Sequence, residues 1–184
     1  MISKKQGGDA LKKKMLIVGI TMSAGGSEKS FLSFAEHIDY KKWDVTLLLA
    51  EKKGAFLPLL PSQIKVETMA DGEIMEISAA NAKKILLEKY VAKNPLRAFP
   101  LAFYATRTAL ANGDKKVYAK NRLWLAAMKT LESHPGEYDL AIAYWGDRTM
   151  FYMVDKVCAK KKTPGSILII VTRPARTRFM RNTL

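Results

Sequence analysis

A short loop of small residues is the stretch whose composition could do chemistry. Thr21–Gly26 reads T-M-S-A-G-G, and Ser27, Glu28 and Lys29 follow it. The apolar run Met15–Ile20 precedes the loop, as expected of a strand buried on both faces. A strand, a glycine loop and a helix in this order gather free backbone N–H groups at a helix N-terminus, where they can bind an anion. The candidate phosphate- or substrate-binding residues of this loop are Gly25, Gly26, Ser27 and Lys29.

Ser27 is expected to cap the helix that follows, with Glu28 in its first turn. The loop matches neither the P-loop spacing nor the G-x-G-x-x-G spacing of dinucleotide-binding folds. A purely structural alternative therefore stays open. In that alternative, Gly25 and Gly26 only permit a tight turn and close packing of helix on strand.

A second candidate loop follows another apolar strand. The pattern predicts a strand over Tyr138–Tyr144, a loop over Trp145–Arg148 and a helix over Thr149–Lys161. Ligands of open α/β sheets bind beyond the carboxyl ends of the strands, so both loops are expected at one edge. The candidate substrate- or phosphate-binding residues of this loop are Trp145, Asp147 and Arg148. Arg148 could pair with a phosphate or carboxylate, and Trp145 could stack on a sugar. The alternative is that Asp147 is a helix N-cap and Arg148 a surface charge.

The remaining patterns predict the elements that position these loops. Two strands are expected, one over Asp44–Ala50 and an outer, half-exposed one over Ile64–Thr68. Three helices are expected after them: one carrying Ile85, Leu86 and Tyr90 and closed by Asn94-Pro95, and one starting near Pro100. The third helix presents to the sheet Val117, Asn121, Trp124, Met128 and Leu131. We therefore expect an α/β fold, a Rossmann-like three-layer sandwich with a mostly parallel sheet.

Bulk composition narrows the function classes. The 184 residues are 48% apolar, enough for one core or one lobe of a larger enzyme. Lys and Arg number 31 against 17 Asp and Glu, a formal charge of +14 that favours anionic partners. The single cysteine, Cys158, excludes an internal disulfide and fits a reducing, cytoplasmic compartment. No apolar run reaches the roughly 18 residues of a membrane span, and Met15–Ile20 is shorter than the about 7–15 residues of a signal-peptide core.

The middle of the chain combines basic and aromatic residues. Between Ala92 and Leu131 there are eight basic residues and one acidic residue, Asp114. Aromatic residues are interleaved with them, among them Phe99, Phe103, Tyr104 and Trp124. One interpretation is a surface that rests on anionic lipid, and the other is an ordinary solvated face with its aromatics in the core.

Two segments carry a resemblance to a known family. The first segment consists of a strand, the loop G-G-S-E-K (Gly25–Lys29), a helix, a polar turn and a second strand. The second segment is Glu137–Tyr144 with the helix after it. Both closely resemble the N-terminal lobe of group-one, family 4-like GT-B glycosyltransferases. The resemblance covers Lys13–Lys162 and is strong at its two ends. It implies an acceptor-binding lobe of an enzyme that transfers sugar from a nucleotide sugar to a glycan or lipid-linked acceptor in cell-envelope polysaccharide synthesis. It also implies docking on the anionic inner leaflet of the membrane.

The same resemblance implies that the nucleotide-sugar donor binds mainly to a second, C-terminal lobe, of which this sequence has no counterpart, and that no resident cofactor is needed. We accordingly expect a flexible lead-in over residues 1–12, the lobe over 13–162 and a divergent tail over 163–184. The tail departs from the family pattern after the lysines that end at Lys162, which suggests a truncated lobe without transferase activity of its own.

The sequence lacks the residue patterns of a metal site and of a serine-nucleophile active site. His37 and His134 have no partner ligands at metal-binding spacing, His134 is expected to face solvent in a turn, and no G-x-S-x-G nucleophile motif occurs. No catalytic residue is identified. Two further functions stay open: a stand-alone phosphate- or nucleotide-binding domain with a flavodoxin-like sheet, and a basic nucleic-acid-binding module, which no recognition helix or RNP-like motif supports.

Overall fold

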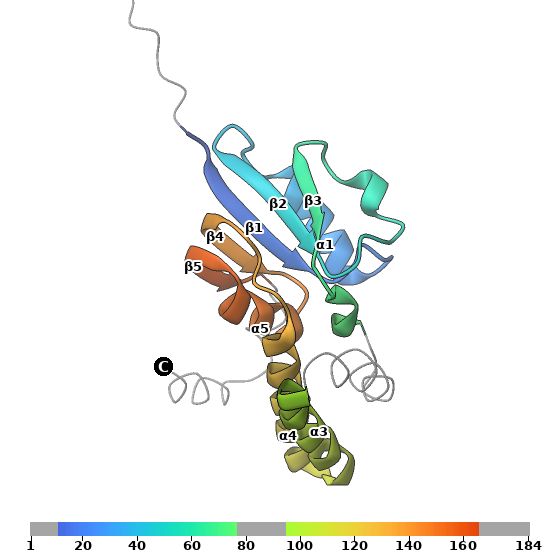
Figure 1. Ribbon diagram of the computed structural model, residues 1–184. Helices are drawn as coiled ribbons and strands as arrows, with labels where there is room; N and C mark the ends of the chain where they lie inside the picture. Colours follow the sequence, from blue (N-terminus) through green and yellow to red (C-terminus); the bar gives the residue numbers. More distant parts are fainter. Residues whose placement is uncertain (1–10, 77–94, 166–184) are drawn as a thin grey trace, which may run out of the picture.

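In the residues that the computed structural model describes, 11–76 and 95–165, five parallel strands form one sheet (Figure 1). The sheet has the strand order β3-β2-β1-β4-β5. The strands are β1 (Lys13–Gly19), β2 (Trp43–Leu49), β3 (Ile64–Thr68), β4 (Glu137–Ala143) and β5 (Cys158–Pro164). Helices cover both faces, so the predicted Rossmann-like three-layer α/β fold is confirmed.

The central strands are apolar because both of their faces are covered. Leu16, Ile17 and Val18 in β1 are completely buried, and β1 pairs in register with β2 on one side and β4 on the other. The edge strands are more polar. β3 alternates apolar and polar residues, as predicted, and β5 carries three consecutive lysines that end at Lys162. Lysines on an edge strand discourage pairing with other chains.

One face of the sheet is covered by α1 (Gly26–Glu36), which lies behind the strands in Figure 1. Phe31 and Ala35 are its fully buried residues, and they pack against Ile17 and Leu47 of the central strands. The 3₁₀ turn η1 (Leu57–Leu59) lies between β2 and β3 along the chain and adds Leu57 to the same cluster.

The other face is covered by α5 (Asp147–Lys156), by the C-terminal half of α4 (Gly113–Thr130) and by the 3₁₀ turn η2 (Gly72–Met75). Trp124 and Met128 of α4 are buried there, as predicted. The first half of α4 pairs instead with α3 (Pro95–Leu110), and this α3–α4 hairpin projects away from the sheet (Figure 1). Val117 is therefore 44% exposed, although the pattern placed it on the sheet-facing side.

Two predicted helix ends differ clearly from the structure. α3 begins at Pro95 and contains Pro100 in its interior, so the helix does not start near Pro100. The helix after β4 ends at Lys156, because Val157 adopts an extended conformation and packs into the core. The residues up to Lys161 that were expected in that helix belong to β5, whose pairing with β4 outweighs its polar composition.

Several predictions lie outside the described residues. They are the lead-in up to residue 10, the helix carrying Ile85–Tyr90, and the tail from residue 166 onward. In the described part of the chain, no helix combines the length and the apolar composition needed to cross a bilayer.

Candidate functional site

The candidate site lies at the carboxyl edge of the sheet, where the chain leaves β1 and β4. These strands are neighbours, and β2 and β5 flank them, so strand order reverses between them. Such a switch point is where open α/β sheets bind ligands, because the loops on either side diverge. Both sequence-predicted loops, the one before α1 and the one after β4, therefore lie at this edge, as expected.

α1 begins at Gly26, and its N-cap lies two residues before the predicted one. Gly25 is the N-cap in an extended conformation, no side chain caps the helix, and Ser27 lies in the first turn. The prediction of Ser27 as N-cap is therefore wrong. Gly25, Gly26, Ser27 and Lys29 are all exposed. The amides of the first turn of a helix have no partner within the helix, so they can take an outside acceptor.

The structural alternative offered for the two glycines finds no support at Gly26. Neither Gly25 nor Gly26 has a positive φ, and a Cβ on Gly26 would meet nothing within 4 Å. A nearby glycine that local geometry does require is Gly54, at φ +125, where a Cβ would lie 2.0 Å from the carbonyl carbon of Met22.

The two loops are joined by a side-chain hydrogen bond. Trp145 Nε1 donates to Glu28 Oε1 at 2.9 Å, and Glu28 is only 8% exposed. The other carboxylate oxygen, Oε2, lies 2.5 Å from the position that a Cβ on Gly25 would occupy. Gly25 thus leaves room for a carboxylate that folds back over the start of its own helix.

Trp145 fills the space between β1 and α1. A Cβ on Gly19, the last residue of β1, would lie 2.8 Å from Cζ3 of the indole. The ring centroid of Trp145 is 5.2 Å from that of Phe31 and 5.3 Å from that of Tyr144. Tyr144 reaches α1 as well, since its hydroxyl is 2.9 Å from Ser30 Oγ. The predicted proximity of Trp145 to the glycine loop is confirmed, but much of the indole surface packs within the protein.

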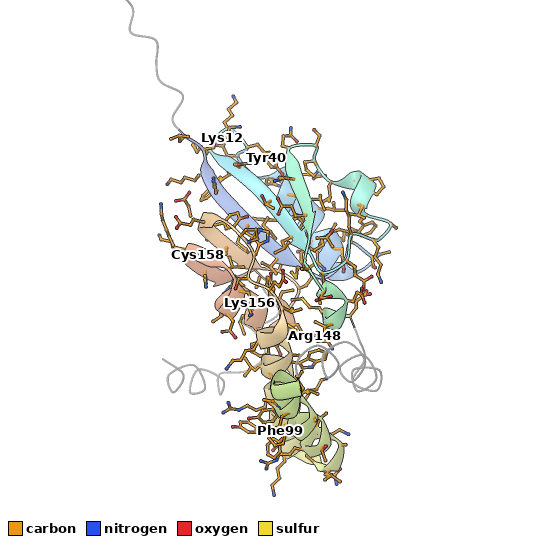
Figure 2. All side chains as sticks on the ribbon, in the orientation of Figure 1. Lys12, Tyr40, Phe99, Arg148, Lys156 and Cys158 are labelled. Atoms are coloured by element: carbon orange, nitrogen blue, oxygen red, sulfur yellow. The ribbon has the colours of Figure 1, made fainter. Side chains whose placement is uncertain are left out.

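Arg148 lies on the opposite face of the sheet from Trp145. Its guanidinium carbon is 3.8 Å from the ring centroid of Trp124, and it donates a hydrogen bond to the backbone carbonyl of Met75. Figure 2 shows it where the α3–α4 hairpin leaves the sheet. Burial lowers the pKa of the guanidinium below its ordinary value. The interpretation of Arg148 as a simple surface charge is therefore wrong, and its contacts tie η2, α4 and α5 together.

Asp147 is the first residue of α5, and Gly146, at φ +89, is the N-cap. The alternative of Asp147 as N-cap is thus also wrong. Its carboxylate is half-buried in the first turn, where a negative charge suits the helix dipole.

A charged cluster lies beyond the carboxyl end of β2. Lys53 pairs with Glu51, at 2.8 Å between Nζ and Oε2, and also with Glu76. Its hydrogen bonds to Glu51 and then to Glu76 raise the pKa of Lys53 to about 12. No ion pair among the described residues involves Lys29, which leaves it as an exposed cation next to the Glu28–Trp145 bond.

His134 is not solvent-facing, in contrast to the sequence expectation. Its side chain is 7% exposed, and its Nε2 lies 2.8 Å from the Tyr138 hydroxyl and 3.5 Å from Glu67 Oε2. Because both partners face the same ring nitrogen, this group cannot relay a proton through the imidazole as a catalytic triad does. In residues 11–76 and 95–165, no group of three acidic, histidine or cysteine side chains could hold a metal ion.

Comparisons with protein-family models, with curated proteins and with solved structures found no match to this chain. The contacts at the carboxyl edge of the sheet are therefore what indicates a function for this chain.

Proposed function

We propose that the chain is the acceptor-binding lobe of a family 4-like GT-B glycosyltransferase, which would bind a saccharide at the carboxyl edge of its sheet. The observation that supports this most is the hydrogen bond between Trp145 and Glu28. It joins the two segments that carry the family resemblance, G-G-S-E-K and the loop after Glu137–Tyr144, at the switch point between β1 and β4.

The exposed groups at this edge suit a ligand rich in hydroxyls. The amides of Gly26 and Ser27 can donate hydrogen bonds, and the Ser27 hydroxyl can both donate and accept. Phe34 is 37% exposed and packs on Tyr144, at 6.0 Å between ring centroids, which provides an apolar ring for the C–H face of a sugar. Gly26 has no packing or conformational role of its own, which is consistent with backbone left open for a ligand.

Under this proposal the nucleotide-sugar donor binds mainly to a second lobe, and the lobe described here selects the acceptor. The acceptor belongs to cell-envelope glycan synthesis and is a glycan or a lipid-linked saccharide. The lobe alone is then expected to show no sugar transfer.

We further propose that the lobe works as a peripheral protein of the inner membrane face, attached through the α3–α4 hairpin. Phe99, Phe103 and Leu110 are 74%, 48% and 79% exposed. Their spacing of four and seven residues places them on one stripe of α3. Exposed cations accompany this stripe, namely Arg107, Lys115, Lys116 and Lys120. A basic helical surface with exposed aromatics is typical of binding to anionic lipid.

Retention of the chain on immobilised saccharides tests the acceptor-binding proposal. The panel comprises oligosaccharides and lipid-linked saccharides of cell-envelope type. Ser27→Tyr places a large side chain beside the first-turn amides, and Ser33→Tyr makes the same change at an exposed serine farther along α1. We expect saturable retention that Ser27→Tyr abolishes and Ser33→Tyr leaves intact. Absence of retention on every saccharide, or equal loss with both variants, would refute the proposal.

A further inference from the structure

The start of α1 already holds an anion, which belongs to the protein. Glu28 is the third residue of the helix, and its Oε2 lies over the N-cap glycine, Gly25. A carboxylate at this position interacts favourably with the partial positive charge of a helix N-terminus. It lies close to the start of the helix without accepting a capping hydrogen bond, whereas a phosphate in a strand–glycine loop–helix arrangement binds the first-turn amides themselves.

This carboxylate is fixed rather than free to leave. It is buried, and its Oε1 accepts the hydrogen bond from Trp145, whose indole is in turn packed against Gly19 and Phe31. Moving the carboxylate away would break that bond and leave the indole N–H without its partner in a half-buried site. Gly25 contributes by lacking the Cβ that would collide with Oε2.

We propose that Glu28, held by Trp145, is a built-in counter-charge that keeps phosphate-bearing ligands away from this edge, so that the acceptor it takes is a neutral, hydroxyl-rich saccharide. The inference rests on the proposed function, because it names the substrate class of the same site. A phosphate group approaching the amides of Gly26 and Ser27 would meet a like charge that solvent screens poorly. A neutral hydroxyl meets no such repulsion.

The nearest cation does not cancel the negative charge of Glu28. Lys29 is exposed, so water and salt screen its ammonium group, whereas the Glu28 carboxylate is buried and screened less. Arg148 does not help either, since its guanidinium stacks on Trp124 on the other face of the sheet. The fixed charge next to the first-turn amides is therefore negative.

Titration of the ¹⁵N-labelled chain with inorganic phosphate tests the proposal, with the amide resonances of Gly26 and Ser27 as the readout. These two resonances distinguish binding at this edge from general attraction to a chain of charge +14. Glu28→Gln removes the charge and keeps an oxygen for Trp145. Glu36→Gln, at an exposed position in the last turn of α1, changes the net charge equally and is the control.

We expect no saturable shift of the two amides in the wild type or in Glu36→Gln, and phosphate binding about tenfold tighter in Glu28→Gln. Saturable millimolar phosphate binding at Gly26 and Ser27 in the wild type would overturn the proposal, and this arm remains decisive if Glu28→Gln fails to fold. A second arm compares retention on neutral saccharides with retention on their phosphorylated counterparts. Equal retention on both overturns the inference, whereas retention on neither refutes the proposed function and leaves phosphate exclusion standing.

Discussion

Trp145 Nε1 donates a hydrogen bond of 2.9 Å to Glu28 Oε1, across 117 positions of sequence. The bond connects the loop after β4 to the first turn of α1, at the point where strand order reverses in the sheet. It fixes an indole and a carboxylate side by side at the edge where an α/β sheet binds its ligands.

Replacement of Trp145 by Phe should lower the free energy of unfolding by about 1–3 kcal/mol, because Glu28 then loses the donor to its buried carboxylate. Trp43→Phe, in the first position of β2, is the matched control and should cost less. Urea denaturation followed by circular dichroism measures both. Equal losses in the two variants would show that ring size, and not the hydrogen bond, determines the effect.

Gly26→Ala should raise the free energy of unfolding by roughly 0.5–1 kcal/mol, because alanine favours the helix and its Cβ meets nothing. Gly54→Ala should instead lower it by more than about 2 kcal/mol, since the Cβ would collide with the backbone of Met22 at a positive φ. Thermal denaturation compares the two. A destabilised Gly26→Ala would restore a structural role for that glycine and weaken the proposal of an open backbone.

Arg148→Lys should be destabilising by about 1–3 kcal/mol, although the charge is conserved. An ammonium group cannot both stack flat on Trp124 and reach the carbonyl of Met75. The control is Arg107→Lys, because Arg107 lies over the Phe103 ring at 5.7 Å in an exposed position. Its expected cost is within about 0.5 kcal/mol. Chemical denaturation that showed no difference between the two variants would contradict the role given to Arg148.

Stability should fall as the pH drops below about 6.5, where the unfolded histidine begins to take up a proton. Burial lowers the pKa of His134 in the folded chain, and the nearby Glu67 only partly opposes this. The unfolded chain then binds more protons, so stability is complete above that pH and decreases toward the folded pKa. Lys65 and Tyr138 also face this histidine. Denaturation midpoints from pH 7.5 downward measure the slope.

The control for this pH dependence is the comparison of His134→Gln with His37→Gln, in which the replaced imidazole is exposed. Only His134→Gln should flatten the slope. An unchanged slope in His134→Gln would assign the pH dependence to other groups.

Binding to vesicles that contain anionic lipid should weaken with salt and depend on the α3–α4 hairpin. Lys115→Gln with Lys116→Gln should reduce co-sedimentation with phosphatidylglycerol vesicles by about tenfold or more. Lys41→Gln with Lys42→Gln makes the same charge change in the turn before β2 and should have little effect. Equal losses of vesicle binding in the two double variants, or tighter binding to duplex or single-stranded nucleic acid than to vesicles, would instead favour the alternative of a basic nucleic-acid-binding module.

The sheet could be predicted because its inner strands are apolar on both faces, as in Met15–Ile20, and parallel strands require that pattern. The rule that ligand loops gather at the carboxyl edge also placed Trp145 near Gly25 correctly. β5 was missed because Cys158–Pro164 is polar, and its conformation comes from pairing with β4 rather than from its own propensity.

The side-chain contacts at the site could be predicted less well from the sequence. Trp145 and Arg148 are three residues apart, yet one packs toward α1 and the other toward α4, a divergence that follows from tertiary packing at the end of β4. Glu28 could be recognised only as a first-turn acid, because nothing in the spacing shows that Gly25 leaves room for its carboxylate. Its position three residues after a glycine N-cap is the one sequence signal that could have indicated it.

The most direct test of the central claim follows the indole Nε1–H resonance of Trp145 and the amides of Gly26 and Ser27 during titration with neutral oligosaccharides. Trp145→Phe assigns the indole signal among the three tryptophans of the chain. At least one saccharide is expected to cause saturable shifts of these three resonances and to leave the resonances of the α3–α4 hairpin unaffected. Shifts confined to the hairpin or to the amino ends of the strands, or no shift with any saccharide, would contradict that claim.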